Sequence, residues 1–206
     1  MSKRIAAVLS IALTMPTIAL TALTGSPASA APTVDQLERA LLAPAQAPAG
    51  FSFHSRRVLA RTVTPPPTAD PCKPTTAAFT DAPGGSVSVS FQKGGKDGNL
   101  ITESINAIGA KAAADHIKRQ QTILDRCPTM TKNVTYSKWQ APAAAGATSI
   151  GFMTTVQEPK EPAVKAVTVA VAHGEVLATF TAEATDTAAL NTLVTTGVAK
   201  IKQTVR

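Results

Sequence analysis

Two alternating runs in the second half of the chain are separated by only two residues, His173 and Gly174. The runs are AVKAVTVAVA at 163–172 and EVLATFTAE at 175–183. Apolar residues at every second position predict half-buried strands. A two-residue connection can join such strands only as an antiparallel hairpin, because a parallel crossover needs about a dozen residues or more. The chain is therefore expected to fold around antiparallel sheet.

Further strand and helix patterns extend this prediction over the rest of the chain. Other strand candidates are FSFHSRRVLART at 51–62, GSVSVSFQ at 85–92, LITESINAI at 100–108, NVTYSKW at 133–139 and TSIGFMTTV at 148–156. Helices are predicted near 33–42, where Thr33 and Gln36 have capping-box spacing, and over 109–127 and 185–206. The expected fold class is α+β, a twisted antiparallel β-sheet of about six to seven strands with flanking helices.

The first thirty residues have the pattern of a secretory signal peptide. Lys3 and Arg4 precede an apolar run, and Ala28-Ser29-Ala30 forms a small-residue cleavage site. The alternative is a membrane anchor, which Pro16 and the cleavage triplet disfavour. We expect cleavage near Ala30, secretion, no membrane contact afterwards, and a single domain over 31–206.

The chain has two cysteines, Cys72 and Cys127, and export places them in an oxidising compartment. Two cysteines allow one intramolecular pairing, so a Cys72–Cys127 disulfide is predicted. The alternative, a reactive thiol or a metal ligand, is disfavoured because the sequence has no Cys-x-x-Cys motif and no histidine near either cysteine.

A basic charge balance raises the question of a nucleic-acid partner. The formal net charge of +7 falls to +5 once Lys3 and Arg4 are removed with the leader, since residues 1–30 hold no acid. The densest cationic group, HSRRVLAR at 54–61, has no interleaved aromatic residue. We interpret it as a solvated strand face and expect no specific binding of nucleic acid.

Nothing in the sequence indicates catalysis. The three histidines, His54, His116 and His173, have no partner visible in the sequence that would activate a nucleophile. Serine-hydrolase, zinc-protease and calcium-loop motifs are absent, so neither an enzyme nor a cofactor or metal site is predicted. A triad assembled only in space, as in an unrecognised hydrolase, stays as the alternative.

Aromatic residues are the remaining candidates for a ligand site. Tyr136 and Trp139 are an odd number of positions apart, so on a strand they point to opposite faces. Trp139, Phe152 and Phe180 are predicted to line a cleft on the sheet, where alternating Thr and Ser leave one face mixed and modestly polar. The alternative is that these aromatics belong to the core.

The order of these elements is similar to that of the PknH-like extracellular sensor domains of actinobacteria. The resemblance rests on QLERALLAP followed by PAGF, on AAADHIKRQQTILDRCP with a cysteine ending the helix, and on the run from 167 to 201. It spans about 33–206. The family's better-known members carry two disulfides, whereas this chain can form one. The resemblance implies a twisted antiparallel sheet with flanking helices and a cleft, acting as a non-catalytic ligand-binding or sensing module.

Two function classes follow from the resemblance and from export. The first is a secreted domain that binds a small molecule or a cell-wall-derived ligand in a cleft on the sheet. The second is an exported protein-interaction module, such as an accessory subunit or a protease inhibitor that presents the proline-rich segment from Thr62 to Thr75.

Overall fold

The computed structural model describes residues 31–64, 70, 72, 80–82, 84–95, 98–127, 129–146 and 148–205. The predicted signal peptide and most of the predicted proline-rich loop lie outside these residues. The main feature is one antiparallel sheet in the order β1-β4-β5-β10-β9-β8-β7-β6. Its strands are β1 (Ser52–Leu59), β4 (Ser86–Gln92), β5 (Leu100–Ala107), β10 (Val176–Glu183), β9 (Val164–His173), β8 (Ser149–Val156), β7 (Val134–Trp139) and β6 (Thr129–Thr131).

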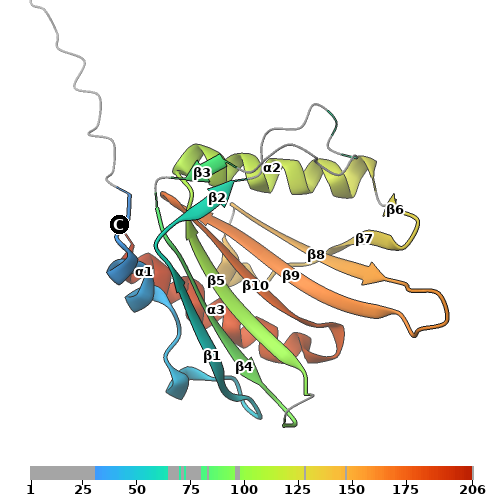
Figure 1. Ribbon diagram of the computed structural model, residues 1–206, viewed down its shortest axis with the longest axis horizontal. Helices are drawn as coiled ribbons and strands as arrows, with labels where there is room; N and C mark the ends of the chain where they lie inside the picture. The colour runs from blue at the N-terminus through green and yellow to red at the C-terminus, as the bar shows by residue number, and fades with distance from the viewer. Residues whose placement is uncertain are drawn as a thin grey trace, which may run out of the picture.

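The sheet confirms the predicted fold class. Seven of its strands have six or more residues and the eighth, β6, has three. The strands splay in a strong twist (Figure 1). His173 pairs with Val176 at the end of the β9–β10 ladder, as the two-residue connection predicts. The second predicted hairpin, β4 with β5, is also present. A separate pair, β2 (Thr62–Thr64) with β3 (Thr80–Ala82), has no counterpart in the prediction.

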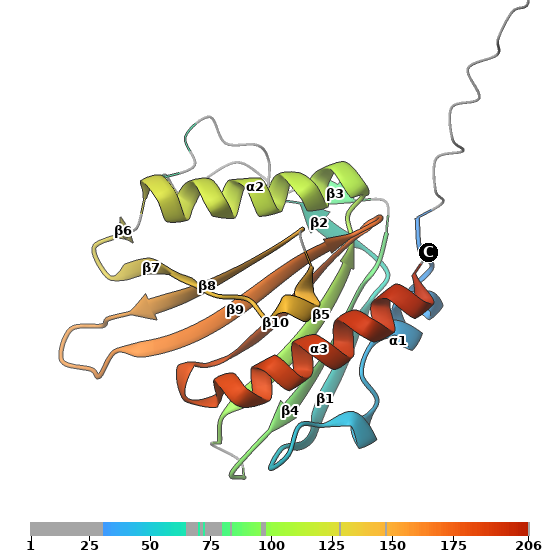
Figure 2. The ribbon, with the colours of Figure 1, turned by 180° about the vertical axis from the view of Figure 1, so that it is seen from behind.

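Among the described residues, three α-helices cover the two faces of the sheet unequally. α3 (Thr187–Thr204) and α1 (Val34–Ala40) lie together on one face, and α2 (Ala110–Arg126) lies across one end of the other (Figures 1 and 2). Short 3₁₀ turns, η1 (Pro44–Gln46), η2 (Ala143–Ala145) and η3 (Ala184–Asp186), connect the longer elements. The sheet is therefore closed on its α3 face and only partly covered on its α2 face.

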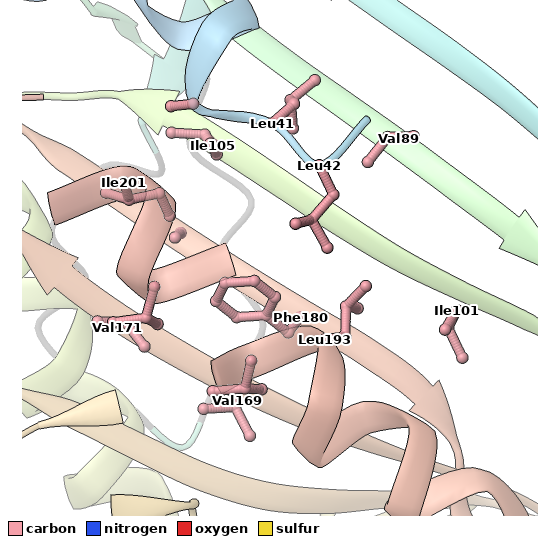
Figure 3. Close-up of a cluster of buried hydrophobic side chains, with 14 of the residues drawn as sticks. Leu41, Leu42, Val89, Ile101, Ile105, Val169, Val171, Phe180, Leu193 and Ile201 are labelled. Atoms are coloured by element: carbon pink, nitrogen blue, oxygen red, sulfur yellow. The ribbon is translucent and has the colours of Figure 1, made fainter. Parts of the chain in front are cut away.

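The main core lies between the sheet and α3 (Figure 3). Alternation in the strands points every second side chain toward α3, and a stripe along α3 meets them. This stripe comprises Leu190, Leu193, Val194, Gly197, Val198 and Ile201. Leu41 and Leu42, which follow α1, complete the cluster from the side.

Local signals account for how two helices begin and end. Thr33 and Gln36 form the predicted capping box at the start of α1, with the Gln36 backbone N–H donating to Thr33 Oγ1. Cys127 is the C-terminal cap of α2 and forms the predicted disulfide with Cys72. The bond therefore ties the end of α2 to a residue that precedes β3 and β4 in the chain.

Candidate functional site

A pocket of about 230 Å³ lies between the second half of α2 and the neighbouring ends of β7 and β8. It is lined by Gln121 and Leu124 of α2, Lys138 and Trp139 of β7, Ser149, Ile150 and Gly151 of β8, and Ala141 of the connecting loop. α2 packs against β7, β8 and β9, and this packing places the helix over the strand ends. The site is thus built from elements that lie near one another in the sequence, within residues 121–151.

Gly151 determines how closely the chain leaving β7 approaches β8. Gly151 is the ladder partner of Trp139. A β-carbon at residue 151 would lie 2.5 Å from the Trp139 carbonyl oxygen and 3.0 Å from the Ala141 nitrogen. Only glycine leaves room for this approach. The close turn brings Trp139 and Ala141 to the pocket.

The rim of the pocket is polar, and the carboxylate of Asp125 binds two of its side chains. Lys138 Nζ lies 2.6 Å from Asp125 Oδ1, and Gln121 Nε2 donates to Asp125 Oδ2 at 2.9 Å. The hydrogen bond from Lys138, and then that from Gln121, lowers the pKa of Asp125. The carboxylate therefore stays ionised at neutral pH and positions two lining side chains.

The floor of the pocket is apolar. Leu124 and Ile150 belong to a second buried cluster between α2 and the sheet, which also contains Ile108, Ala113, Phe152, Ala170 and Leu177. Tyr136 meets the edge of Phe152 with ring centroids 6.1 Å apart. A polar rim over an apolar floor is the usual composition of a small-molecule site.

The three predicted aromatic residues lie in different environments. Trp139 is half-buried and lines the pocket. Phe152 is buried in the same cluster as Leu124 and Ile150. Phe180 is fully buried on the opposite face, beneath α3 (Figure 3). The structure does not bring the three together, and ligand contact by any of them stays a prediction.

Sequence reasoning missed the polar lining residues, Gln121, Lys138 and Ser149. Each looks like an ordinary surface residue of its own element. One signal was present, because Tyr136 and Lys138 share a strand face by alternation, opposite to the face of Trp139. Tyr136 indeed packs on the α2 side, and Trp139 packs against the α3-side core.

The part of the sheet that α2 leaves uncovered carries hydroxyl groups in cross-strand rows. One row runs through Ser90, Thr102, Thr181 and Thr168. Ser90 Oγ and Thr102 Oγ1 are 3.0 Å apart, and Thr168 Oγ1 and Thr181 Oγ1 are 3.1 Å apart. These side chains are half-buried. The row is the mixed, modestly polar face that the alternation predicts.

Glu103 is the most perturbed acid among the described residues, and it lies outside the pocket. It is fully buried on the α3 face of β5, where Oε2 accepts a 2.8 Å hydrogen bond from the Leu42 N–H. Its Oε1 has no hydrogen-bond partner. Burial raises the pKa of Glu103 to about 7, against the opposing effects of the Leu42 N–H and the Lys200 charge. A group so enclosed cannot reach a bound molecule.

Two other features were sought in the part of the chain that the structure describes. No group of three or more His, Cys, Asp or Glu side chains there could hold a metal ion. None of the described helices has both the length and the apolar character needed to cross a bilayer.

Comparison with known proteins finds similarity of structure and none of sequence. No protein-family profile and no curated protein sequence matches it. The extracellular domain of PknH from Mycobacterium tuberculosis is similar in structure, with a TM-score of 0.54 and 10% sequence identity. The match covers 84% of this chain and 97% of that domain. The likeness between the two is one of fold.

Proposed function

We propose that this chain is an exported, non-catalytic domain that binds a small molecule or a cell-wall-derived fragment in the pocket between α2 and the β7–β8 strands. One observation carries the proposal, namely the apolar floor of Leu124 and Ile150 beneath a rim of Gln121 and Lys138. Such convergence of a few polar groups over apolar walls is typical of ligand sites.

The lining limits the chemistry of the ligand. Lys138 is already paired with Asp125, so the rim offers hydrogen bonds more readily than net charge. The amide of Gln121 above the apolar side chains of Leu124 and Ile150 suits a neutral, hydroxyl- or amide-bearing ring. At about 230 Å³ the pocket is smaller than sites for drug-sized ligands, which makes a single sugar ring or the end of a longer glycan the best fit.

Export is part of the proposal. The Cys72–Cys127 disulfide and the extracellular origin of the PknH domain both support it. We propose cleavage near Ala30, secretion of a single domain over 31–206, and function without a cofactor. The protease-inhibitor alternative depended on the segment from Thr62 to Thr75, most of which lies outside the described residues, and no observation favours it.

The test uses Trp139, which is the only tryptophan in the chain and lines the pocket. Its fluorescence is titrated with purified fractions of a cell-wall digest. A saturable change is expected with at least one fraction. Gln121→Ala and Lys138→Met should each weaken binding by up to about tenfold, the effect of losing one hydrogen bond.

A matched control separates the pocket from the helix surface. Lys111 of α2 also forms an ion pair, with Asp115, but it does not line the pocket. Lys111→Met should bind like the parent protein. If no fraction produces a saturable change, or if Lys111→Met is as impaired as Lys138→Met, the proposed site is wrong.

A further inference from the structure

The strand β1 forms one margin of the sheet (Figure 1). All eight of its side chains are exposed, including Phe53 at 46%, Val58 at 43% and Leu59 at 49%. No other strand of six or more described residues has this burial pattern. The opposite margin of the sheet is the three-residue strand β6.

The outer edge of β1 is not paired with any strand of the described residues. β1 pairs with β4 on one side. Among the described residues, the backbone hydrogen bonds outside helices and ladders do not involve Ser52–Leu59. After a bulge between Phe53 and Ser55, the register is regular from Ser55 to Leu59. An edge of this length is a template for one more strand.

The charge of this edge indicates what kind of strand it accepts. Within Ser52–Leu59 there are two arginines and no acid. Arg56 is balanced by Glu38 of α1, which it contacts at 3.5 Å. Arg57 faces the α2 side of the sheet, as the ladder partner of Ser88, and makes no ion pair with a described residue. An incoming strand with a carboxylate opposite Arg57 would give this arginine an ion-pair partner.

The same arginines disfavour a second copy of this chain as the partner. Two β1 strands paired antiparallel about the centre of the regular segment would place Arg57 of one copy directly opposite Arg57 of the other. Like charges directly opposite each other are destabilising in a sheet. The exposed apolar side chains of Val58 and Leu59 add contact area for a partner that alternates acidic and apolar residues.

From these observations we propose that the β1 edge binds an extended acidic peptide segment of another protein by strand addition. The proposal concerns a surface remote from the α2 pocket and does not depend on ligand binding there. Main-chain hydrogen bonds to Ser55–Leu59 provide affinity, and Arg57 selects for a carboxylate.

The test is binding of a capped peptide of about seven residues that alternates valine and glutamate. Binding should shift the backbone amide resonances of Ser55–Leu59 and leave those of β6 unchanged. N-methylation of alternate residues along one edge of the peptide should abolish binding, because it removes the hydrogen-bond donors that pair with β1. The same modification along the other edge should have little effect.

Variants of the protein give an independent check. Arg57→Glu should weaken binding by roughly tenfold or more, because it places like charges together. Lys132→Glu, in the turn between β6 and β7, makes the same charge change at the far margin and should bind like the parent. Equal unfolding temperatures would show that both variants are folded.

Three results would overturn the proposal. The first is no binding of the unmodified peptide. The second is equal binding of both N-methylated peptides, or equally tight binding of inorganic polyphosphate at the same residues. Either result would show that the surface binds by charge attraction and not by strand addition. The third is a concentration-dependent dimer of the protein in which the β1 amides are protected, which would assign the edge to a second copy.

Discussion

Glu103 and Gly197 lie so close that a β-carbon on residue 197 would come within 2.7 Å of Glu103 Oε1. The glycine lets α3 approach β5 directly above the buried carboxyl. The same β-carbon would lie 2.5 Å from Phe180 Cε1. The packing of α3 on the sheet therefore depends on the absence of a side chain at Gly197, directly above the buried carboxyl of Glu103.

Gly197→Ala is expected to destabilise the protein although alanine is the better helix former. The gain in helix propensity is about 1 kcal/mol, whereas overpacking against the Phe180 ring and Glu103 costs about 1 to 3 kcal/mol. Urea denaturation measures the balance. Thr195→Ala, at an exposed position of the same helix, is the control and should change stability by less than about 0.5 kcal/mol. A Gly197→Ala protein more stable than the parent would contradict the packing described.

Because the pKa of Glu103 is raised in the folded protein, we predict that the protein loses stability as the pH rises. This pKa is about 7 in the folded protein against an ordinary value of 4.5, so the folded state keeps the proton that the unfolded chain releases. The full contribution is present below pH 4.5 and is lost as the pH rises through 7. The loss amounts to about 3 kcal/mol when complete.

Comparison with Glu103→Gln isolates this effect, because other titrating groups are common to both proteins. The amide cannot ionise, so the stability of the variant relative to the parent should rise by about 3 kcal/mol between acidic pH and pH 8. Urea denaturation at several pH values checks it. A constant difference between the two proteins across that range would show that Glu103 does not titrate as described.

Much of the fold could be predicted because it depends on local patterns. Alternation marked β4, β8 and β10, and the two-residue connection at His173 and Gly174 required antiparallel pairing. Alternation in LITESINA also places Glu103 on the same face as Ile101 and Ile105. A buried acid was therefore visible in the sequence, although its enclosure depends on α3 and Gly197.

The candidate site could not be predicted to the same extent. Gln121, Lys138 and Ser149 meet only because α2 docks across the ends of β7 and β8, and no local pattern specifies that docking. The odd spacing between Tyr136 and Trp139 correctly predicted that their side chains lie on opposite faces of the strand. It could not show which face α3 would close, and so it could not show that Phe180 and Trp139 pack on the α3 side and Phe152 on the α2 side.

Removal of the disulfide should lower stability markedly. The bond joins residues separated by 55 positions, and closing a loop of that length contributes about 4 kcal/mol in the chain-entropy model. Cys127→Ser, or reduction of the parent, should lower the urea midpoint accordingly. The denatured, unreduced protein should contain no thiol that reacts with a maleimide. Two reactive thiols before reduction would contradict the pairing in the mature protein.

Nucleic acid should bind weakly and without sequence preference. The formal charge of +5 on residues 31–206 follows from 18 cations and 13 acids after removal of Lys3 and Arg4. Retention on an oligonucleotide should fade as salt rises, since it reflects counterion release alone. Anisotropy titrations at two salt concentrations measure this. Tight binding of one oligonucleotide at physiological salt would point to a nucleic-acid site that the structure does not suggest.

Native mass spectrometry of the protein purified from the culture medium of its source tests the ligand pocket most directly. The comparison is with Gln121→Phe, which places a ring over the pocket from an exposed position on α2. We predict that the parent carries a non-covalent adduct that denaturation releases, and that Gln121→Phe, folded to the same melting temperature, lacks it. A parent protein without any adduct, or an adduct equally abundant on both proteins, would contradict binding in this pocket.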